Sequence, residues 1–353
     1  MDFTLPPKLE RGDKVAVLRP GNGPAKTEFP EVYELGIERM EDIFGFELVE
    51  FPSCDQDMEE LTEHPERRAQ ELEEAFRKDD IQAIFAAIGG TGEQVRILKH
   101  LDSEVLRENP TRFYGYSDNT SFGLYLWNQG IINFQGPMVM TEFAMNGEMH
   151  DYTTRKIRDA VFRDSFGDVQ ASEKFTDETL EWGQDNLDEH KEMEPHPGLE
   201  WYNSGQGTVE GRIWGGCLDV ISINLQAGKN IPPARELESQ VLALETSEEM
   251  PSKEFVDRFM MSLGERGLLE NFSAVIVGLP KAQHRERKPS KQERDSYREE
   301  QRKTIREKVD EYTEGIPVVF NLNFGHADPI LPLPIGGKIV LDTDSETVRI
   351  PLE

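Results

Sequence analysis

The feature of this sequence that most constrains its fold is the alternation of short apolar segments with amphipathic segments over the first third of the chain. Short strands are predicted at residues 14–18, 46–51, 81–88 and 112–116. Helices are predicted between and after them, at residues 30–44, 65–78, 93–101 and from 120 to about 127. Alternating strands and helices predict an α/β fold with a parallel sheet that is covered by helices.

Length and pattern together predict two domains. A chain of 353 residues exceeds the usual size of one domain and suits two. Between about residues 165 and 207 the pattern dissolves into acidic sequence with prolines and glycines, as in a linker or an active-site loop. Short strands and helices return beyond it, including a charged, exposed helix at residues 285–311. We therefore expect a first domain at residues 1–165, a linker or active-site loop at 166–207 and a smaller α/β domain at 208–353.

The net charge limits the partners that the chain can have. Acidic side chains number 68 against 39 basic ones, which gives a formal charge of −29 at pH 7. Such a charge disfavours nucleic acid as a partner. The acidic residues are spread along the whole chain, which predicts a solvated acidic surface and suggests, as a hypothesis, adaptation to high internal salt.

The sequence gives no sign of a membrane segment or of a cysteine-based site. No apolar run approaches the roughly 18 residues of a membrane span, and no basic segment followed by an apolar run marks a leader. A cytoplasmic protein without a membrane partner is therefore expected. Cys54 and Cys217 lie far apart and in no metal-like spacing, so neither a disulfide framework nor a zinc site is predicted.

One serine lies where a nucleophile could be exposed. The predicted strand at 112–116 contains Gly115 and leads into Ser117, and a helix follows. A strand, a sharp turn with a serine and a helix together form the plan of a nucleophile elbow. The second glycine of the usual motif is missing, and a serine before a helix also serves as an N-cap. Ser117 is thus a candidate nucleophile, with a helix cap as the alternative.

A nucleophilic serine needs a base and an orienting carboxylate. Among the seven histidines, His326 alone follows a predicted strand directly, in a loop fixed by glycine and proline. Glu245 ends the apolar run at 241–244. Strand ends are where active-site residues of α/β proteins gather, and the order serine, glutamate, histidine is one that such hydrolases use. The alternatives are a histidine that bonds a loop carbonyl and a glutamate exposed to solvent.

Two segments could supply backbone N–H groups to an oxyanion. Gly89, Gly90 and Thr91 close the strand predicted to neighbour that of Ser117, and Asp118 follows the serine. The rival interpretation of the glycines is a phosphate cradle for a dinucleotide. Their spacing and their position outside the first strand–helix unit fit that interpretation poorly.

Taken together, these segments resemble the LD-carboxypeptidase family of serine peptidases, and within it the microcin C immunity branch. The resemblance covers nearly the whole chain in order. Its blocks include residues 19–21, 83–90, 114–120, 135–137, 211–216, 244–248, 278–281 and 320–336. The resemblance implies a Rossmann-like N-terminal domain, a smaller C-terminal α/β domain, a site between them, a homodimer, and no metal or organic cofactor. It also implies that Ser117, Glu245 and His326 form the triad and that the N–H groups of Gly90 and Asp118 form the oxyanion hole.

The substrate is less constrained by the resemblance. The blocks around Gly89 and Glu245 look more like the immunity branch, which cleaves the amide of aminoacyl or peptidyl adenylate analogues, than like the carboxypeptidases of muropeptide tetrapeptides. In that branch a loop tryptophan covers the nucleobase, and Trp182 looks like its counterpart, although a loop aromatic also packs on its own loop. Cys217 stands at a position where members of this family usually have asparagine. A binding protein that does not cleave its peptidyl-nucleotide ligand is the alternative from another class.

Overall fold

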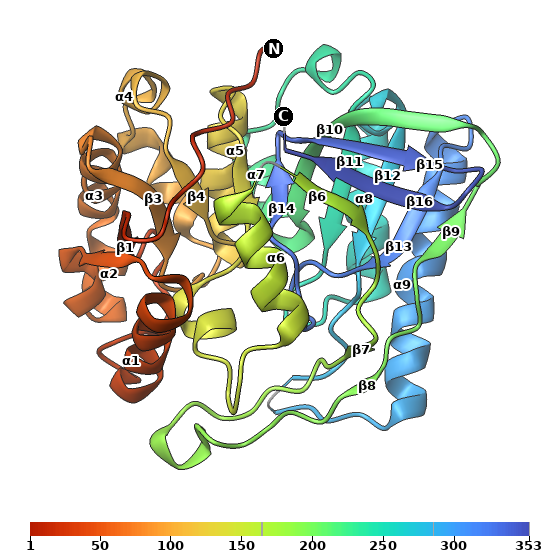
Figure 1. Ribbon diagram of the computed structural model, residues 1–353. Coiled ribbons are helices and arrows are strands. Elements are labelled where there is room, and N and C mark those ends of the chain that lie inside the picture. Colours follow the sequence, from red (N-terminus) through yellow and green to blue (C-terminus); the bar gives the residue numbers. More distant parts are fainter. Residues whose placement is uncertain (164, 285, 353) are drawn as a thin grey trace.

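The computed structural model describes residues 1–163, 165–284 and 286–352, and it contains a six-stranded sheet, an eight-stranded sheet and a small two-stranded sheet. In Figure 1 the N-terminal third, in red and orange, lies to one side, and the cyan and blue strands lie to the other. The predicted α/β fold with parallel strands is confirmed. None of the helices in the described ranges combines the length and the apolar character that a bilayer crossing requires.

The six-stranded sheet has the order β14-β5-β4-β3-β1-β2, and its first five strands in the chain run parallel. They are β1 (Lys14–Leu18), β2 (Glu47–Glu50), β3 (Ile81–Ala86), β4 (Arg112–Tyr114) and β5 (Asn133–Gln135). The strand order reverses between β1 and β3, because the chain passes from β1 to β2 on one side and then to β3 on the other. Such a reversal opens a crevice at the carboxyl ends of the two strands, where α/β proteins bind ligands.

The helices of this half are α1 (Pro30–Arg39), α2 (Met58–Glu63), α3 (Pro65–Arg77), α4 (Ser103–Glu108), α5 (Thr120–Asn128) and α6 (Asp151–Phe162). The buried residues of α3 include Ala69, Leu72, Ala75 and Phe76, which form its apolar face. The helix predicted at 93–101 is wrong, since only two short 3₁₀ turns form there. Bonds to the serine turn explain the difference: the Gln94 backbone N–H donates to Asp118, and its side chain donates to Asn119.

The eight-stranded sheet has four parallel central strands, β10 (Thr208–Cys217), β11 (Val241–Glu245), β12 (Ala274–Gly278) and β13 (Val318–Leu322). Antiparallel strands extend both edges: β15 (Lys338–Asp342), β16 (Thr347–Pro351) and β6 (Ser165–Val169) on one side and β9 (Glu200–Tyr202) on the other. Its helices are α7 (Leu218–Ala227), α8 (Lys253–Glu265) and α9 (Lys291–Tyr312).

Some segments pair with a sheet far from them in the chain. β14 (Leu333–Ile335) runs antiparallel to β5, so the C-terminal part of the chain completes the first sheet. β6 pairs with β16 of the second sheet, and β7 (Lys174–Phe175) pairs with β8 (Glu194–Pro195) in the acidic loop. The division at residues 165 and 207 stays a prediction.

Helix α9 begins later than the sequence pattern suggests. Residue 285, where the predicted helix starts, lies outside the described residues. The helix starts at Lys291 after Ser290, which forms a capping box with Glu293. One face is buried, so α9 is not a fully solvated helix: Arg298, 4% exposed, pairs with the buried Asp177 of the acidic loop. This ion pair links the acidic loop to helix α9.

Candidate active site

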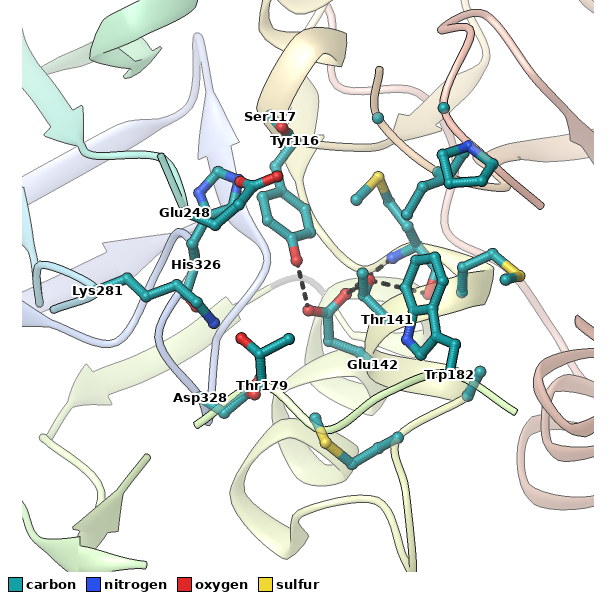
Figure 2. A pocket seen from close by; sticks show the side chains of 18 of the residues that line it. Tyr116, Ser117, Thr141, Glu142, Thr179, Trp182, Glu248, Lys281, His326 and Asp328 are labelled. Atoms are coloured by element: carbon teal, nitrogen blue, oxygen red, sulfur yellow. Dashed lines mark hydrogen bonds and ion pairs between the residues drawn. The ribbon is translucent and has the colours of Figure 1, made fainter. Parts of the chain in front are cut away.

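A cavity of about 540 Å³ lies where the carboxyl ends of strands from both sheets meet. The turns after β1 and β3 line it at the reversal of strand order, and so do Ser117 from the turn after β4 and His326 from the loop after β13. Figure 2 shows the serine and the histidine on one side of the cavity, with Trp182 across from them. The chain therefore brings the predicted nucleophile and base into one cavity, although 209 residues separate them in the sequence.

Ser117 has the backbone conformation of a nucleophile elbow. Its φ is +61°, in the left-handed region that residues with a side chain rarely adopt. A 3₁₀ turn at Ser117–Asn119 continues directly into α5. Such strain persists where the surrounding structure fixes it, and it clusters at functional sites. The strained turn aims the serine at the cavity, at the N-terminal end of a helix.

The turn after β3 packs directly on the serine turn. A Cβ on Gly89 would lie 3.1 Å from Ser117 Oγ and 3.5 Å from the Asp118 nitrogen, so the chain needs a glycine there to bring the two turns together. A Cβ on Gly90 would lie 2.5 Å from the Asp118 carboxylate. These contacts place the two predicted oxyanion segments side by side, next to the serine hydroxyl.

Asp118 ties the two turns together from behind. Its carboxylate is buried and accepts the backbone N–H of Gln94 at 3.2 Å. Burial raises the pKa of Asp118 to about 7, and the Gln94 N–H opposes that rise. The neighbouring Asn119 donates to the carbonyl of Ile88 at 3.1 Å. The positions of the backbone N–H groups around Ser117 are therefore fixed by buried hydrogen bonds.

Glu245 and His326 form a direct hydrogen-bonded pair. Glu245 ends β11 and is 2% exposed, and its Oε2 lies 2.7 Å from Nδ1 of His326. Two glycines make room for the carboxylate. A Cβ on Gly325 would lie 2.5 Å from the same oxygen, and one on Gly278 would lie 3.0 Å from the Glu245 Cβ. The glutamate is thus a buried partner of the histidine rather than the solvent-exposed acid that the sequence left open.

The other imidazole nitrogen faces a second glutamate, which the sequence did not single out. Nε2 of His326 lies 2.9 Å from Oε2 of Glu248, without the alignment of a hydrogen bond. Figure 2 shows the Glu248 side chain against the imidazole. Tyr116 completes this environment, since its ring packs edge-on against the imidazole at 5.0 Å.

The two glutamates set the charge of the imidazole. Burial lowers the pKa of His326, but the charges of Glu245 and Glu248, together with the hydrogen bond to Glu245, outweigh it and raise that pKa well above its usual value. Burial raises the pKa of Glu248, yet the adjacent histidine outweighs it and lowers that pKa to about 2. This arrangement favours the protonated imidazole.

Two further acids of the cavity, Glu142 and Asp328, have hydrogen-bond or ion-pair partners. Glu142 accepts hydrogen bonds from Tyr116 Oη at 3.1 Å and from Thr141 Oγ1 at 2.6 Å, and burial raises its pKa to about 7. Asp328 lies 2.7 Å from the ammonium group of Lys191. Figure 2 shows both carboxylates at the base of the cavity.

Trp182 lies on the acidic loop and lines the cavity opposite His326. Its ring packs edge-on against Phe29, with the ring centroids 5.3 Å apart. Trp201, the second aromatic residue of that region, belongs to the edge strand β9 instead. The loop therefore contributes an aromatic wall to the site.

The structure brings the six predicted site residues together, and it adds others. Ser117, Gly90, His326 and Trp182 line the cavity, and Glu245 and Asp118 lie directly behind it. Sequence reasoning missed Glu142, Lys191, Glu248, Lys281 and Asp328 as lining residues. The signal for Glu248 was its place just after a strand-end glutamate, but its polar neighbours made it look like any solvated acid.

One group of described residues has donor atoms suited to a metal ion. Cys217, Glu245 and His326 each bring a donor to within 4.8 Å of the others. Cys217 is the register partner of Glu245 in the parallel pair β10–β11. Because Nδ1 of His326 already faces Glu245, a metal here would displace the proton of that bond. The absence of a metal or organic cofactor stays a prediction.

Two protein-family models match the chain. The LD-carboxypeptidase N-terminal domain matches residues 15–136, and the LD-carboxypeptidase C-terminal domain matches residues 210–341. The first range contains Ser117, and the second contains Glu245 and His326.

Two relatives support the same family. The microcin C7 self-immunity protein MccF of Escherichia coli is 28% identical over 80% of this chain and 77% of its own length. A probable murein peptide carboxypeptidase of Bacillus subtilis is 24% identical over 98% of this chain and 93% of its own.

Solved structures share the whole fold. A structure of MccF in complex with aspartyl sulfamoyl adenosine is 25% identical, covers 99% of both chains and superposes with a TM-score of 0.82. An MccF-like protein from Streptococcus pneumoniae in complex with AMP is 23% identical, covers 97% of this chain and 99% of that one, and has a TM-score of 0.83. At this low identity, the second match supports the fold alone.

Proposed function

The chain belongs to the LD-carboxypeptidase family of serine peptidases, and from this premise we propose that it hydrolyses an amide bond with Ser117 as nucleophile, His326 as base and Glu245 as the carboxylate that orients the base. The observation that carries the proposal is the 2.7 Å contact between Glu245 Oε2 and His326 Nδ1, beside a cavity that Ser117 and His326 both line. This contact engages Nδ1, so Nε2 is the nitrogen that would serve the serine.

The proposed reaction has two halves. Nε2 of His326 takes the proton from Ser117 Oγ as the oxygen attacks the carbonyl carbon, and it returns that proton to the leaving nitrogen. Water then attacks the acyl-enzyme and gives its proton to Nε2, which returns it to Ser117 Oγ as the acid is released. Glu245 stabilises the imidazolium that forms in each half.

The oxyanion of each tetrahedral intermediate would be held by the backbone N–H groups of Gly90 and Asp118. The closeness of Gly89 to both Ser117 Oγ and the Asp118 nitrogen supports this assignment. Fixed N–H donors are worth several kcal/mol to a developing oxyanion, roughly 3 to 4 for one donor.

We favour an aminoacyl or peptidyl group joined to an adenylate analogue as the substrate. A relative of 25% identity has been solved with aspartyl sulfamoyl adenosine, and in this chain Trp182 gives the cavity an aromatic wall on which an adenine could stack. The second candidate is a muropeptide tetrapeptide, because a relative that spans nearly the whole chain is a probable murein peptide carboxypeptidase.

A homodimer and a cytoplasmic location complete the proposal. Light scattering would test whether the protein is a homodimer.

A paired assay tests the function. The wild type and Ser117→Ala would be incubated with an aminoacyl sulfamoyl adenosine and with an L,D-tetrapeptide, and the products would be identified by mass spectrometry. Ser262→Ala is the matched control, since Ser262 is an exposed serine on α8. We expect one substrate to be cleaved by the wild type and the control but not by Ser117→Ala. Hydrolysis that survives in Ser117→Ala would refute the nucleophile, and intact binding without cleavage by the wild type would favour a binding protein.

A further inference from the structure

Glu248 occupies the place at His326 that the serine needs. A general base must present an unprotonated Nε2 to the serine hydroxyl. Here Nε2 faces the Glu248 carboxylate at 2.9 Å, while Nδ1 is engaged by Glu245. An imidazole held between two carboxylates keeps both protons, so in this arrangement it cannot accept one from Ser117.

The surroundings of the imidazole do not offset these two carboxylates. The groups that face His326 are Glu245, Glu248, Tyr116, Cys217, Asp219 and Lys281. Lys281 is the one cation among them, and its ammonium group contacts the backbone carbonyl of His326 at 3.4 Å rather than the ring. To free Nε2, the carboxylate of Glu248 must therefore turn away.

Glu248 is placed to turn toward the cavity. Its side chain is 46% exposed and lines the cavity, whereas the oxygen that faces His326 is buried. It belongs to the polar segment that follows β11, and the exposed Glu249 beside it lines the same cavity. A half-exposed glutamate that changes rotamer needs no movement of the backbone.

A cation in the cavity would draw Glu248 away. Asp328 is already paired with Lys191, and the hydrogen bonds of Glu142 occupy its carboxyl group. Within the described ranges, neither Glu248 nor Glu249 forms an ion pair with a lysine or an arginine that lines the cavity. Among the described lining acids, Glu248 and Glu249 are therefore carboxylates that a cation could approach without displacing a lysine, although the ammonium group of Lys281 also lines the cavity.

We propose that Glu248 binds the free α-ammonium group of the substrate's acyl part, and that this contact pulls its carboxylate off Nε2 and so frees His326 to act as the base. The inference rests on the proposed function, because an aminoacyl group attacked by Ser117 carries its ammonium one carbon from the reacting carbonyl. On binding, Glu248 exchanges the imidazolium for the ammonium group, and the Nε2 proton passes to solvent. Binding of the substrate thereby converts His326 to the neutral imidazole that can act as the base.

Binding measurements in the inactive Ser117→Ala background test the contact without turnover. The probes are an aminoacyl sulfamoyl adenosine and its N-acetyl counterpart, which lacks the positive charge. We expect calorimetry to show about tenfold or more tighter binding of the free amine, as a charge-assisted contact gives. This preference should vanish in Ser117→Ala/Glu248→Gln and persist in the matched control Ser117→Ala/Glu249→Gln. An unchanged preference without Glu248, or an equal loss in both variants, would overturn the proposal.

The pH profile of kcat/KM tests the release of His326, because it reports the free enzyme. Removing the Glu248 charge should lower the governing pKa, so the acidic limb of Glu248→Gln should move to lower pH by about one unit or more. An unmoved limb would overturn the proposal. If the wild type cleaves neither substrate, the proposed function fails, and the binding comparison still decides whether Glu248 receives the amine.

Discussion

Gly325 and Glu245 touch so closely that no side chain fits between them: a Cβ on Gly325 would lie 2.5 Å from the carboxylate oxygen that bonds His326. Gly325 also has a φ of +97°, a conformation that other residues rarely adopt. Residue 325, just before the proposed base, must therefore be a glycine both for the close contact with Glu245 and for its positive φ. Both requirements concern the position of the imidazole.

Gly325→Ala should remove most activity at a moderate loss of stability. The methyl group displaces the Glu245 carboxylate, and the strained backbone costs about 1 to 3 kcal/mol. The matched control is Gly228→Ala, which has a φ of +63° but no neighbour within 4 Å of the added Cβ. Steady-state kinetics and urea unfolding of both variants separate the two effects. Equal loss of activity in the control would show that strain alone, and not the contact with Glu245, is responsible.

Glu142 should make stability fall between about pH 4.5 and pH 7. Burial raises its pKa in the folded protein to about 7 from the usual 4.5, so the folded state holds the proton more tightly than the unfolded chain does. The resulting stabilisation is fully present below pH 4.5 and is lost as the pH rises through 7, with a slope of at most about 1.4 kcal/mol per pH unit. Glu142→Gln should flatten the pH dependence of urea unfolding over this window. A variant that follows the wild-type curve would refute the assignment.

Much of the fold was predictable because its buried strands are continuous apolar runs between turns. β1 matches its predicted range residue for residue. β14 was not predictable, since a strand of three residues pairs with β5 from nearly 200 residues away. The 3₁₀ turns near Gln94 also escaped prediction, because buried side-chain hydrogen bonds decide the local structure there.

The site was predictable to the extent that it lies at strand ends. Ser117, Glu245 and His326 each follow or end a strand, and parallel strands bring such ends to one edge. Glu248 was not predictable as a partner of His326, because its approach depends on the path of the segment after β11. Periodicity says nothing about that path.

Both cysteine thiols should resist alkylation in the native protein. Cys54 and Cys217 are buried, and burial raises the pKa of Cys54 to about 12 and that of Cys217 well above its usual value. The thiolate is the reactive species, so iodoacetamide near pH 8 should label neither residue in the folded state and both in urea. Mass spectrometry counts the adducts. Rapid native labelling of Cys217 would show that this thiol is ionised or accessible beside Glu245.

Molar KCl should raise both the melting temperature and the activity. A formal charge of −29 repels itself in the compact state, and salt screens that repulsion. Thermal unfolding at low and at molar KCl measures the shift, and sucrose at matched osmolality controls for exclusion of solute from the surface. A fall of stability and activity in KCl would contradict adaptation to salt.

Trp182→Ala should weaken the binding of AMP while Trp201→Ala leaves it unchanged. The Trp182 ring lines the cavity and is braced edge-on by Phe29, whereas Trp201 lies on the edge strand β9. Stacking of a base on an aromatic ring is worth about 1 to 3 kcal/mol, which corresponds to a loss of about 5-fold to 150-fold in affinity. Trp182→Phe keeps a smaller ring and should fall between. Calorimetry with AMP measures all three variants, and an affinity unchanged in Trp182→Ala would mean that the tryptophan serves only to pack its own loop on Phe29.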